Sequence, residues 1–244
     1  MVAVTQPTLS VVMPVYNEAA GIEDVVAEVT KHILDRVDES ELVIVDDRST
    51  DDTHARLESL SAQDTRIRVL VNPVNVGHGR SVRRAIDSSS GEWIFHLDSD
   101  GQVDVAEFAL LWAHHIDSDL VLGQRITRHD PRHRLLLTAL TRRFVSVLAR
   151  RRVPDANAPF KLIRRDLFDH LAPSIPDTVF APSILIVLGA LRSGATVTEV
   201  EITHLERRHG KSTLRLNRLA AAVRRSAIET LQFSRRPPRP FIRR

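Results

Sequence analysis

The first 125 residues alternate short apolar runs with amphipathic ones, and this alternation limits the fold more than any other feature of the chain. Strand-like runs span residues 9–15, 42–45, 67–71, 92–97 and 120–122, and helix-like runs between them span 19–34, 50–60, 79–87 and 106–114. Strands that alternate with helices are typical of a mostly parallel sheet covered by helices on both faces. We therefore predict an α/β fold in which ligands bind beyond the carboxyl ends of the strands.

Polar side chains follow several of these predicted strands. They are Tyr16, Asn17, Glu18, Asp46, Asp47, Asp98, Asp100, Gln124 and Arg125. Because the carboxyl ends of parallel strands meet at one edge of a sheet, these side chains are expected to lie near one another. The sequence therefore places the functional site at that edge.

The segment Asp98-Ser99-Asp100-Gly101 carries two carboxylates that flank a single residue. Such a pair can share a divalent cation, and Mg²⁺ and Mn²⁺ both prefer oxygen ligands. The same four residues are also favourable for a surface turn, so the segment alone is compatible with either role. The 11 histidines show no spacing typical of metal ligands.

Composition excludes several other classes of protein. The chain has no cysteine, which rules out disulfides and thiolate metal sites and agrees with a cytoplasmic location. The N-terminus lacks the pattern of a signal peptide. The longest apolar run, residues 184–191, is much shorter than the ~20 residues of a membrane span. We therefore predict no transmembrane segment.

Arginine is concentrated in the second half of the chain. Residues 132–152 and 214–231 both form amphipathic helical patterns with arginines on the polar side, followed by a Pro- and Arg-rich tail, 234–244, that we predict to be disordered. Each helix can simply pack on the core, or it can lie on an anionic membrane surface. The basic helices lack interleaved exposed aromatic residues, so nucleic acid is not an expected partner.

A series of short motifs in a particular order points to a known family. The motifs "PVYNE", "VDDRSTDDT", "NVGHGR", "HLDSDGQ" and "GQR" resemble those of the family 2 glycosyltransferases, which have the GT-A fold. The later segments 155–168, "DANAPFKLIRRDLF", and 206–213, "ERRHGKST", resemble the branch of dolichol-phosphate mannose synthase and polyprenyl-phosphate glycosyltransferases. The resemblance implies a Rossmann-like, mostly parallel sheet, with a catalytic domain at 1–205 that includes helix 132–152. A basic acceptor-site segment, an amphipathic helix and the tail would follow at 206–244.

The resemblance also implies roles for individual residues. Those implied to border the nucleotide are Pro14, Tyr16, Glu18, Asp46, Asp47, Gly77 and Arg80, with Asp47 accepting a hydrogen bond from a uracil or guanine base. For Arg80 a solvated position at the start of a helix is the alternative. Asp98 and Asp100 are implied to hold Mg²⁺ or Mn²⁺ and the donor diphosphate, with Gln102 near the sugar. The residues implied to face phosphates of donor or acceptor are Arg125, Arg207, Lys211 and Ser212.

In such enzymes an acceptor oxygen attacks the anomeric carbon and inverts it. Asp155 is the candidate general base or acceptor-orienting carboxylate, and a salt bridge to one of the arginines 150–152 is its alternative role. Pro159 stands before Phe160 where relatives commonly have glycine, so the local geometry of the acceptor loop is expected to differ.

The expected function is therefore metal-dependent transfer of a sugar from a GDP or UDP donor to a polyprenyl phosphate at a membrane surface. Transfer to a soluble hydroxyl acceptor or a nascent glycan is the alternative, followed by non-catalytic binding of a sugar nucleotide. The expected location is the cytoplasm, with peripheral binding to the inner face of the membrane. The sugar, the base and the oligomeric state are not predicted.

Overall fold

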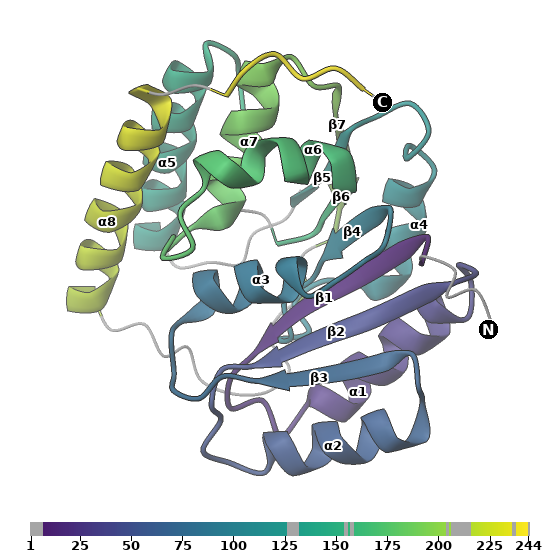
Figure 1. Cartoon of the computed structure of the whole chain (residues 1–244). Helices are drawn as coiled ribbons and strands as arrows, with labels where there is room; N and C mark the ends of the chain where they lie inside the picture. Colours follow the sequence, from purple (N-terminus) through teal and green to yellow (C-terminus); the bar gives the residue numbers. More distant parts are fainter. Residues whose placement is uncertain are drawn as a thin grey trace.

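The computed structural model of the chain describes residues 7–125, 132–153, 156, 159–203, 205, 216–235 and 238–243, with backbone alone for 132–139, 141 and 216–220. In this part of the chain, seven strands form one sheet in the order β3-β2-β1-β4-β6-β5-β7 (Figure 1). The strands are β1 (Leu9–Val15), β2 (Ser40–Asp46), β3 (Ile67–Val71), β4 (Trp93–His96), β5 (Leu120–Arg125), β6 (Lys161–Arg164) and β7 (Val197–Ile202). The predicted α/β fold is confirmed.

Strand directions determine where the site can form. The strands β3, β2, β1 and β4 run parallel, β6 is antiparallel to both of its neighbours, β4 and β5, and β7 is parallel to β5. One edge of the sheet therefore gathers the carboxyl ends of six strands and the amino end of β6. The sequence predicted β1 to β5 but neither β6 nor β7.

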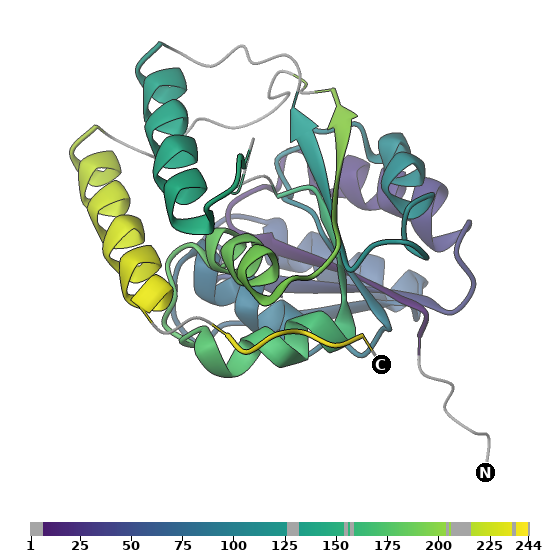
Figure 2. The ribbon, with the colours of Figure 1, turned by 90° about the horizontal axis from the view of Figure 1, so that it is seen from above.

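The helices cover both faces of the sheet. They are α1 (Ile22–Val29), which continues as a π-helical turn (Thr30–Leu34), α2 (Thr53–Gln63), α3 (His78–Asp87), α4 (Phe108–Trp112), α5 (Arg132–Ala149), α6 (Arg165–Leu171), α7 (Pro182–Ser193) and α8 (Leu216–Arg235). Short 3₁₀ turns precede α4 (Val105–Glu107) and follow α6 (Ala172–Ser174). The views in Figures 1 and 2 show α1, α2 and α4 on one side of the sheet and α3, α5, α6, α7 and α8 on the other.

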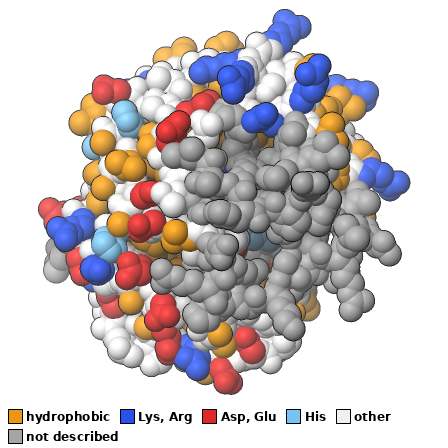
Figure 3. Space-filling view, turned by 180° about the vertical axis from the view of Figure 1, so that it is seen from behind, with side chains coloured by type: hydrophobic (Ala, Val, Ile, Leu, Met, Phe, Trp, Pro, Cys, Tyr) orange, Lys and Arg blue, Asp and Glu red, His pale blue; other side chains and the backbone are white. Residues whose placement is uncertain are grey.

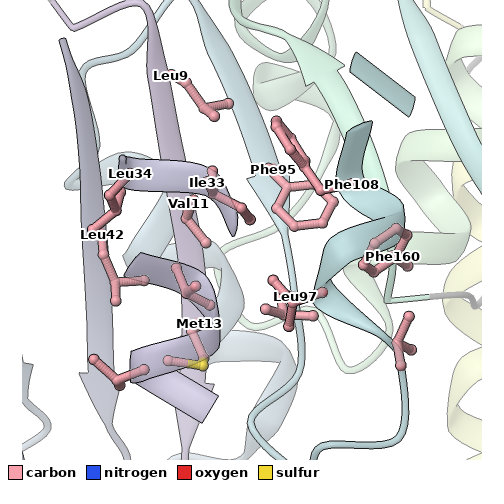
Figure 4. Close-up of a cluster of buried hydrophobic side chains, with 14 of the residues drawn as sticks. Leu9, Val11, Met13, Ile33, Leu34, Leu42, Phe95, Leu97, Phe108 and Phe160 are labelled. Atoms are coloured by element: carbon pink, nitrogen blue, oxygen red, sulfur yellow. The ribbon is translucent and has the colours of Figure 1, made fainter. Parts of the chain in front are cut away.

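Each face of the sheet has its own hydrophobic core. Along β1, Val11 and Met13 point into the cluster shared with α1 and α4, whereas Val12 between them points into the cluster shared with α3 and α7. This explains why β1 is apolar at nearly every position, as expected for a strand buried on both faces. In the first cluster, Phe95 contacts Phe108 and Phe160 edge to face, with ring centroids 4.8 Å apart in both pairs (Figure 4).

The tail departs from the prediction of disorder in the residues that are described. The backbone N–H of Phe241 donates a 2.8 Å hydrogen bond to the carbonyl of Ser193, and the Phe241 side chain packs on the second core cluster. The single aromatic residue of the tail thus supplies the apolar contact that prolines and arginines lack.

Two helices, α5 and α8, lie side by side on the outside of α7 (Figures 1 and 2). Phe144, Val145 and Leu148 of α5 pack on the second core cluster, which confirms the packing interpretation for this part of the helix. Leu140 and Val147, however, are 57% and 69% exposed. No helix of the described residues is both long enough and apolar enough to span a membrane.

Candidate active site

The loop after β1 is tied to the loop after β2. Asn17 has a positive φ of 55°, and its Oδ1 accepts a 2.8 Å hydrogen bond from the N–H of Thr50, while its own N–H donates to the Ser49 Oγ at 3.0 Å. The N–H of Glu18 donates to the hydroxyl of Thr53 at the start of α2. Pro14, by contrast, is buried within β1. Of the nucleotide residues implied on β1 and its loop, Tyr16 is the most open to solvent, with 40% exposure.

Asp46 and Asp47 are both buried, and both carboxylates accept hydrogen bonds from backbone N–H groups. At the end of β2, Asp46 Oδ1 accepts hydrogen bonds from the N–H and the hydroxyl of Ser49 at 2.9 and 2.6 Å, which stabilises the turn that leads to α2. Asp47 is only 3% exposed. Their first role is therefore to shape the edge of the sheet.

Asp47 organises the loop that connects β3 to α3. Its Oδ1 accepts from the Asn72 side-chain amide at 2.7 Å and the Val76 N–H at 2.8 Å, and its Oδ2 accepts from the Gly77 N–H at 2.8 Å. Gly77 has a φ of +91°, a conformation that favours glycine. The carboxylate thereby sets the position of His78, the first residue of α3. This function of Asp47 was not predicted.

The predicted D-x-D segment follows β4 and faces the start of α3. His78 Nε2 lies 2.9 Å from Asp98 Oδ1, and His96 Nε2, on the last residue of β4, lies 3.6 Å from the same oxygen. The ligand atoms of these three side chains are all within 4.8 Å of one another. The histidines show no metal-ligand spacing in the sequence, and the proximity of His78 to His96 arises instead from the packing of α3 on β1 and β2.

The second carboxylate of the segment is part of a turn. Asp100 Oδ1 accepts a 3.2 Å hydrogen bond from the N–H of Gln102, and Gly101 between them has a φ of +66°. The segment therefore has both of the properties that the sequence suggested: it is a turn, and it presents carboxylates at the edge where ligands bind.

The three clustered side chains have perturbed ionisation. Burial lowers the pKa of His96 to about 4, against the opposing effect of Asp98. Burial raises the pKa of Asp98, but the charge and the hydrogen bond of His78 outweigh it and hold that pKa below its ordinary value. Partial loss of hydration lowers the pKa of His78, whose side chain is still 57% exposed, but the charge and the hydrogen bond of Asp98 outweigh this effect and raise that pKa. At neutral pH the cluster therefore contains a carboxylate beside an uncharged, buried imidazole.

A buried lysine joins the site from the antiparallel strand. Lys161 opens β6, is fully buried and pairs with His96 across the two strands. Its positive charge lowers the pKa of both histidines, which places it within electrostatic reach of the cluster. Lys161 was not among the predicted site residues, although a lysine at the start of an apolar strand is an unusual core residue and therefore a signal in the sequence.

The remaining predicted residues differ in what the structure says of them. Arg80 lies on the first turn of α3, half-buried, and makes no hydrogen bond or ion pair with other described residues. Arg125 ends β5 at the same edge of the sheet. The predicted residues that lie outside the described part of the chain are Asp155, Arg207, Lys211 and Ser212.

Several known proteins are similar to this chain in sequence or in fold. The chain is 25% identical over 206 residues to an undecaprenyl-phosphate 4-deoxy-4-formamido-L-arabinose transferase of Proteus mirabilis, covering 84% of this chain and 62% of the relative. It is 27% identical over 204 residues to glycosyltransferase AglD of Haloferax volcanii, covering 80% of this chain and 32% of the relative. The chain thus spans less than two thirds of the length of either curated relative.

Among solved structures, glucosyl-3-phosphoglycerate synthase from Mycobacterium tuberculosis has the same fold. Its complex with phosphoglyceric acid superposes with a TM-score of 0.72 at 25% identity, covering 95% of this chain and 81% of that chain. Its complex with Mn²⁺, uridine diphosphate and glucosyl-3-phosphoglycerate gives a TM-score of 0.73 at 24% identity, with the same coverage of both chains.

The family match covers the strands β1 to β6 and the clustered side chains described above. Residues 10–172 match the family described as Glycosyl transferase family 2. This range begins in β1 and includes the D-x-D segment, both histidines of the cluster and Lys161. The chain therefore belongs to glycosyl transferase family 2, and the domain that it carries is a glycosyltransferase domain.

Proposed function

We propose that the protein is an inverting, metal-dependent glycosyltransferase that moves a sugar from a nucleoside-diphosphate donor to a polyprenyl phosphate at a membrane surface. The observation that carries the proposal is the D-x-D segment at the ligand-binding edge of a family 2 domain, with buried Lys161 beside it. The printed activity of the Proteus relative, a transfer that involves undecaprenyl phosphate, supports this acceptor class.

The side chains at the edge fit a divalent cation. The ligand atoms of Asp98, His78 and His96 lie close together, and Asp100 follows Asp98 by two residues on the same turn. A cation held there would neutralise negative charge on the departing nucleoside diphosphate. Lys161 adds a cation with little freedom to reorganise, and such preorganised charges stabilise developing negative charge effectively.

The nucleotide is proposed to enter beside Tyr16. This ring is 40% exposed at the end of β1 and is available to pack on a base. Asp46 and Asp47 end the neighbouring strand β2 and its loop as buried carboxylates. Because both already accept hydrogen bonds from backbone N–H groups, a contact with the base would be an additional interaction. Arg80 of α3 is proposed to meet the diphosphate.

The acceptor determines how much base catalysis the reaction requires. A phosphate oxygen is already anionic, so its attack on the anomeric carbon needs little proton removal. A hydroxyl acceptor would require a general base, and Asp155 remains the proposed candidate. Gln102 is proposed to orient the sugar, and the group Arg207, Lys211 and Ser212 to bind phosphate.

The outer surface of α5 and α8 is the proposed membrane-facing side. Exposed apolar side chains lie among exposed arginines on both helices; they are Leu140, Arg142, Arg143 and Val147 on α5, and Arg224, Arg225, Ile228 and Leu231 on α8. Figure 3 shows many basic side chains with apolar ones toward one edge of the molecule, whereas most acidic side chains in that view lie toward the other edge, where basic ones also occur. Helices of this type bind the interface of anionic bilayers.

Vesicle sedimentation tests the membrane-facing side. Replacing Leu140 and Val147 by Asn should remove about 2 kcal/mol of apolar contact, roughly a 30-fold loss of binding to phosphatidylglycerol vesicles. The control is Ile116→Asn, because Ile116 is 67% exposed but lies outside both helices. Equal binding by the double variant and the control would exclude this surface as the docking side.

A soluble acceptor is the second candidate, because the structural neighbour that binds phosphoglyceric acid shares the fold over 95% of this chain. The test offers the protein a panel of UDP- and GDP-sugars with Mn²⁺ and either vesicles that contain polyprenyl phosphate or soluble phosphorylated hydroxy acids. Sugar incorporation into lipid supports the main proposal, and incorporation into the soluble acids alone supports the second. Donor binding without either product would mean a non-catalytic protein.

A further inference from the structure

The 175–181 loop joins the turn after α6 to α7 and lies between α8 and the start of α3 (Figure 1). Ile175 and Val179 are its two buried residues, and they pack in the second core cluster. Its other residues are exposed or half-buried, so apolar contacts do little to fix its shape. The position of the loop therefore depends on the polar contacts that it makes with α3 and α8.

The first turn of α3 packs directly against the backbone of this loop. Gly79 is buried, and a Cβ at this position would overlap the carbonyl oxygen of Phe180. One turn further along α3, the Nη1 of Arg83 donates a 2.7 Å hydrogen bond to the carbonyl of Ile175. A shift of the loop would therefore release the turn that begins with His78, the residue that approaches the D-x-D segment.

Two charged residues of α8 hold the loop from its other side. Glu229 accepts a 2.9 Å hydrogen bond from the N–H of Phe180 through Oε2 and a 3.0 Å hydrogen bond from Arg225 Nε through Oε1. Arg225 also donates a 2.8 Å hydrogen bond to the carbonyl of Thr178, and its Cζ lies 5.5 Å from the centre of the Phe180 ring. The Glu229 side chain is only 18% exposed, so its charge-assisted bond to the loop is largely shielded from water.

We propose that Glu229 and Arg225 are positioning residues for the donor site, acting through the 175–181 loop on the first turn of α3. Phe180 links the two sides, because its N–H binds Glu229 while its carbonyl lies against Gly79. The inference rests on the proposed function for the identity of the site at the start of α3 as the one that meets the donor diphosphate.

The start of α3 is thus held by two separate parts of the chain. Asp47 fixes the residue before the turn by accepting from the Gly77 N–H, and the 175–181 loop fixes the turn itself. Because α8 holds that loop, the helix that carries the proposed membrane-facing surface also supports the donor site. Loss of the α8 contacts should therefore loosen the first turn of α3 even though no residue of α8 touches the donor.

Amide hydrogen exchange of the full chain, without lipid or nucleotide, is the first test. We expect Glu229→Ala to speed exchange roughly 10-fold or more in the 175–181 loop and in the first turn of α3, because a charge-assisted hydrogen bond is lost. The reporter in α3 is the N–H of Ser81, which donates to the carbonyl of Gly77. Glu229→Gln keeps an acceptor for the Phe180 N–H and should stay within about 3-fold of the wild type. The control Gln232→Ala changes an exposed residue of the same helix and should alter neither segment.

The second test is calorimetric titration with UDP and with GDP in the presence of Mn²⁺. We expect the affinity for the nucleotide that binds to fall roughly 10-fold in Glu229→Ala and to recover in Glu229→Gln, a pattern that a general loss of stability would not produce. Arg225→Gln is the second variant, because a side chain that is 51% exposed can be replaced without disturbing the core. It should change exchange and affinity in the same direction as Glu229→Ala.

The outcomes separate this inference from the proposed function. Faster exchange confined to the 175–181 loop, with the first turn of α3 and the nucleotide affinity unchanged, would overturn the inference even in an active transferase. Faster exchange in both segments and weaker nucleotide binding, in a protein that transfers no sugar, would support the inference and overturn the proposed function.

Discussion

Asp47→Asn tests whether a buried carboxylate builds the nucleotide side of the site. Asp47 accepts three hydrogen bonds, one from the side chain of Asn72 and two from the backbone N–H groups of Val76 and Gly77. An asparagine of the same shape keeps one acceptor oxygen but turns an NH₂ group toward one of these donors. The substitution therefore removes a charge-assisted hydrogen bond and leaves a donor unsatisfied.

The magnitude follows from these contacts. A hydrogen bond to a charged group contributes about 1.5–3 kcal/mol, and an unsatisfied buried donor costs about 1–3 kcal/mol. Because the two effects partly overlap, we expect a loss of about 2–4 kcal/mol in the free energy of unfolding. For a chain of this size the melting temperature should fall by roughly 5–15 °C.

The assay is urea denaturation followed by circular dichroism, together with the donor KM. We expect a lower midpoint at an unchanged slope, and a donor KM that rises more than kcat falls, because His78 follows the released loop. The matched control is Asp52→Asn, since Asp52 is exposed and its side chain caps no N–H of α2. A stability change below about 1 kcal/mol, equal to that of the control, would refute the role assigned to Asp47.

Three further predictions concern separate parts of the molecule. Asp98→Ala and Asp100→Ala should each lower kcat at least 100-fold while the thermal melt in the absence of metal stays cooperative. Full turnover in either variant would show that the D-x-D segment has only a structural role as a turn. Gly79→Ala should destabilise the protein by about 1–3 kcal/mol, because a Cβ there overlaps the Phe180 carbonyl, and an unchanged melting temperature would contradict this packing. Burial raises the pKa of Glu41, but hydrogen bonds from Ser10 and Ser90 and the charge of Arg68 outweigh it, so the folded-state pKa is below 4.5. Its contribution of about 1–3 kcal/mol, measured against Glu41→Gln, is present above pH ~4.5 and is lost as the pH falls further; a difference independent of pH would contradict it.

The strands that the sequence predicted are those with the simplest patterns. Residues 9–15 and 67–71 form β1 and β3 with the predicted limits, because runs of apolar, β-branched residues bounded by polar turns have few alternatives. The strand β7 was missed because "VTEVEI" lacks the continuous apolar run of the predicted strands, and only Ile202 of it is buried. The antiparallel strand β6 was missed because it is only four residues long and pairs with β4 and β5, which lie far from it in the sequence.

The site shows the same division between local and non-local information. The edge of the sheet and the D-x-D segment could be predicted, because both follow from where strands end. The approach of His78 to His96 could not, since it depends on how the Asp47 carboxylate positions the loop before α3. The burial of Lys161 depends in turn on the pairing of β6 with β4. Side chains that meet through packing, rather than through spacing, are the ones that sequence analysis missed.

The most direct test of the central claim measures release of nucleoside diphosphate from a panel of sugar nucleotides, with Mn²⁺ and vesicles that contain polyprenyl phosphate. We predict release from one donor, matched by an equal amount of glycolipid of inverted anomeric configuration, and loss of both on addition of EDTA. Absence of glycolipid with every donor, or full activity in EDTA, would contradict the account of a metal-dependent transferase that acts on a lipid phosphate.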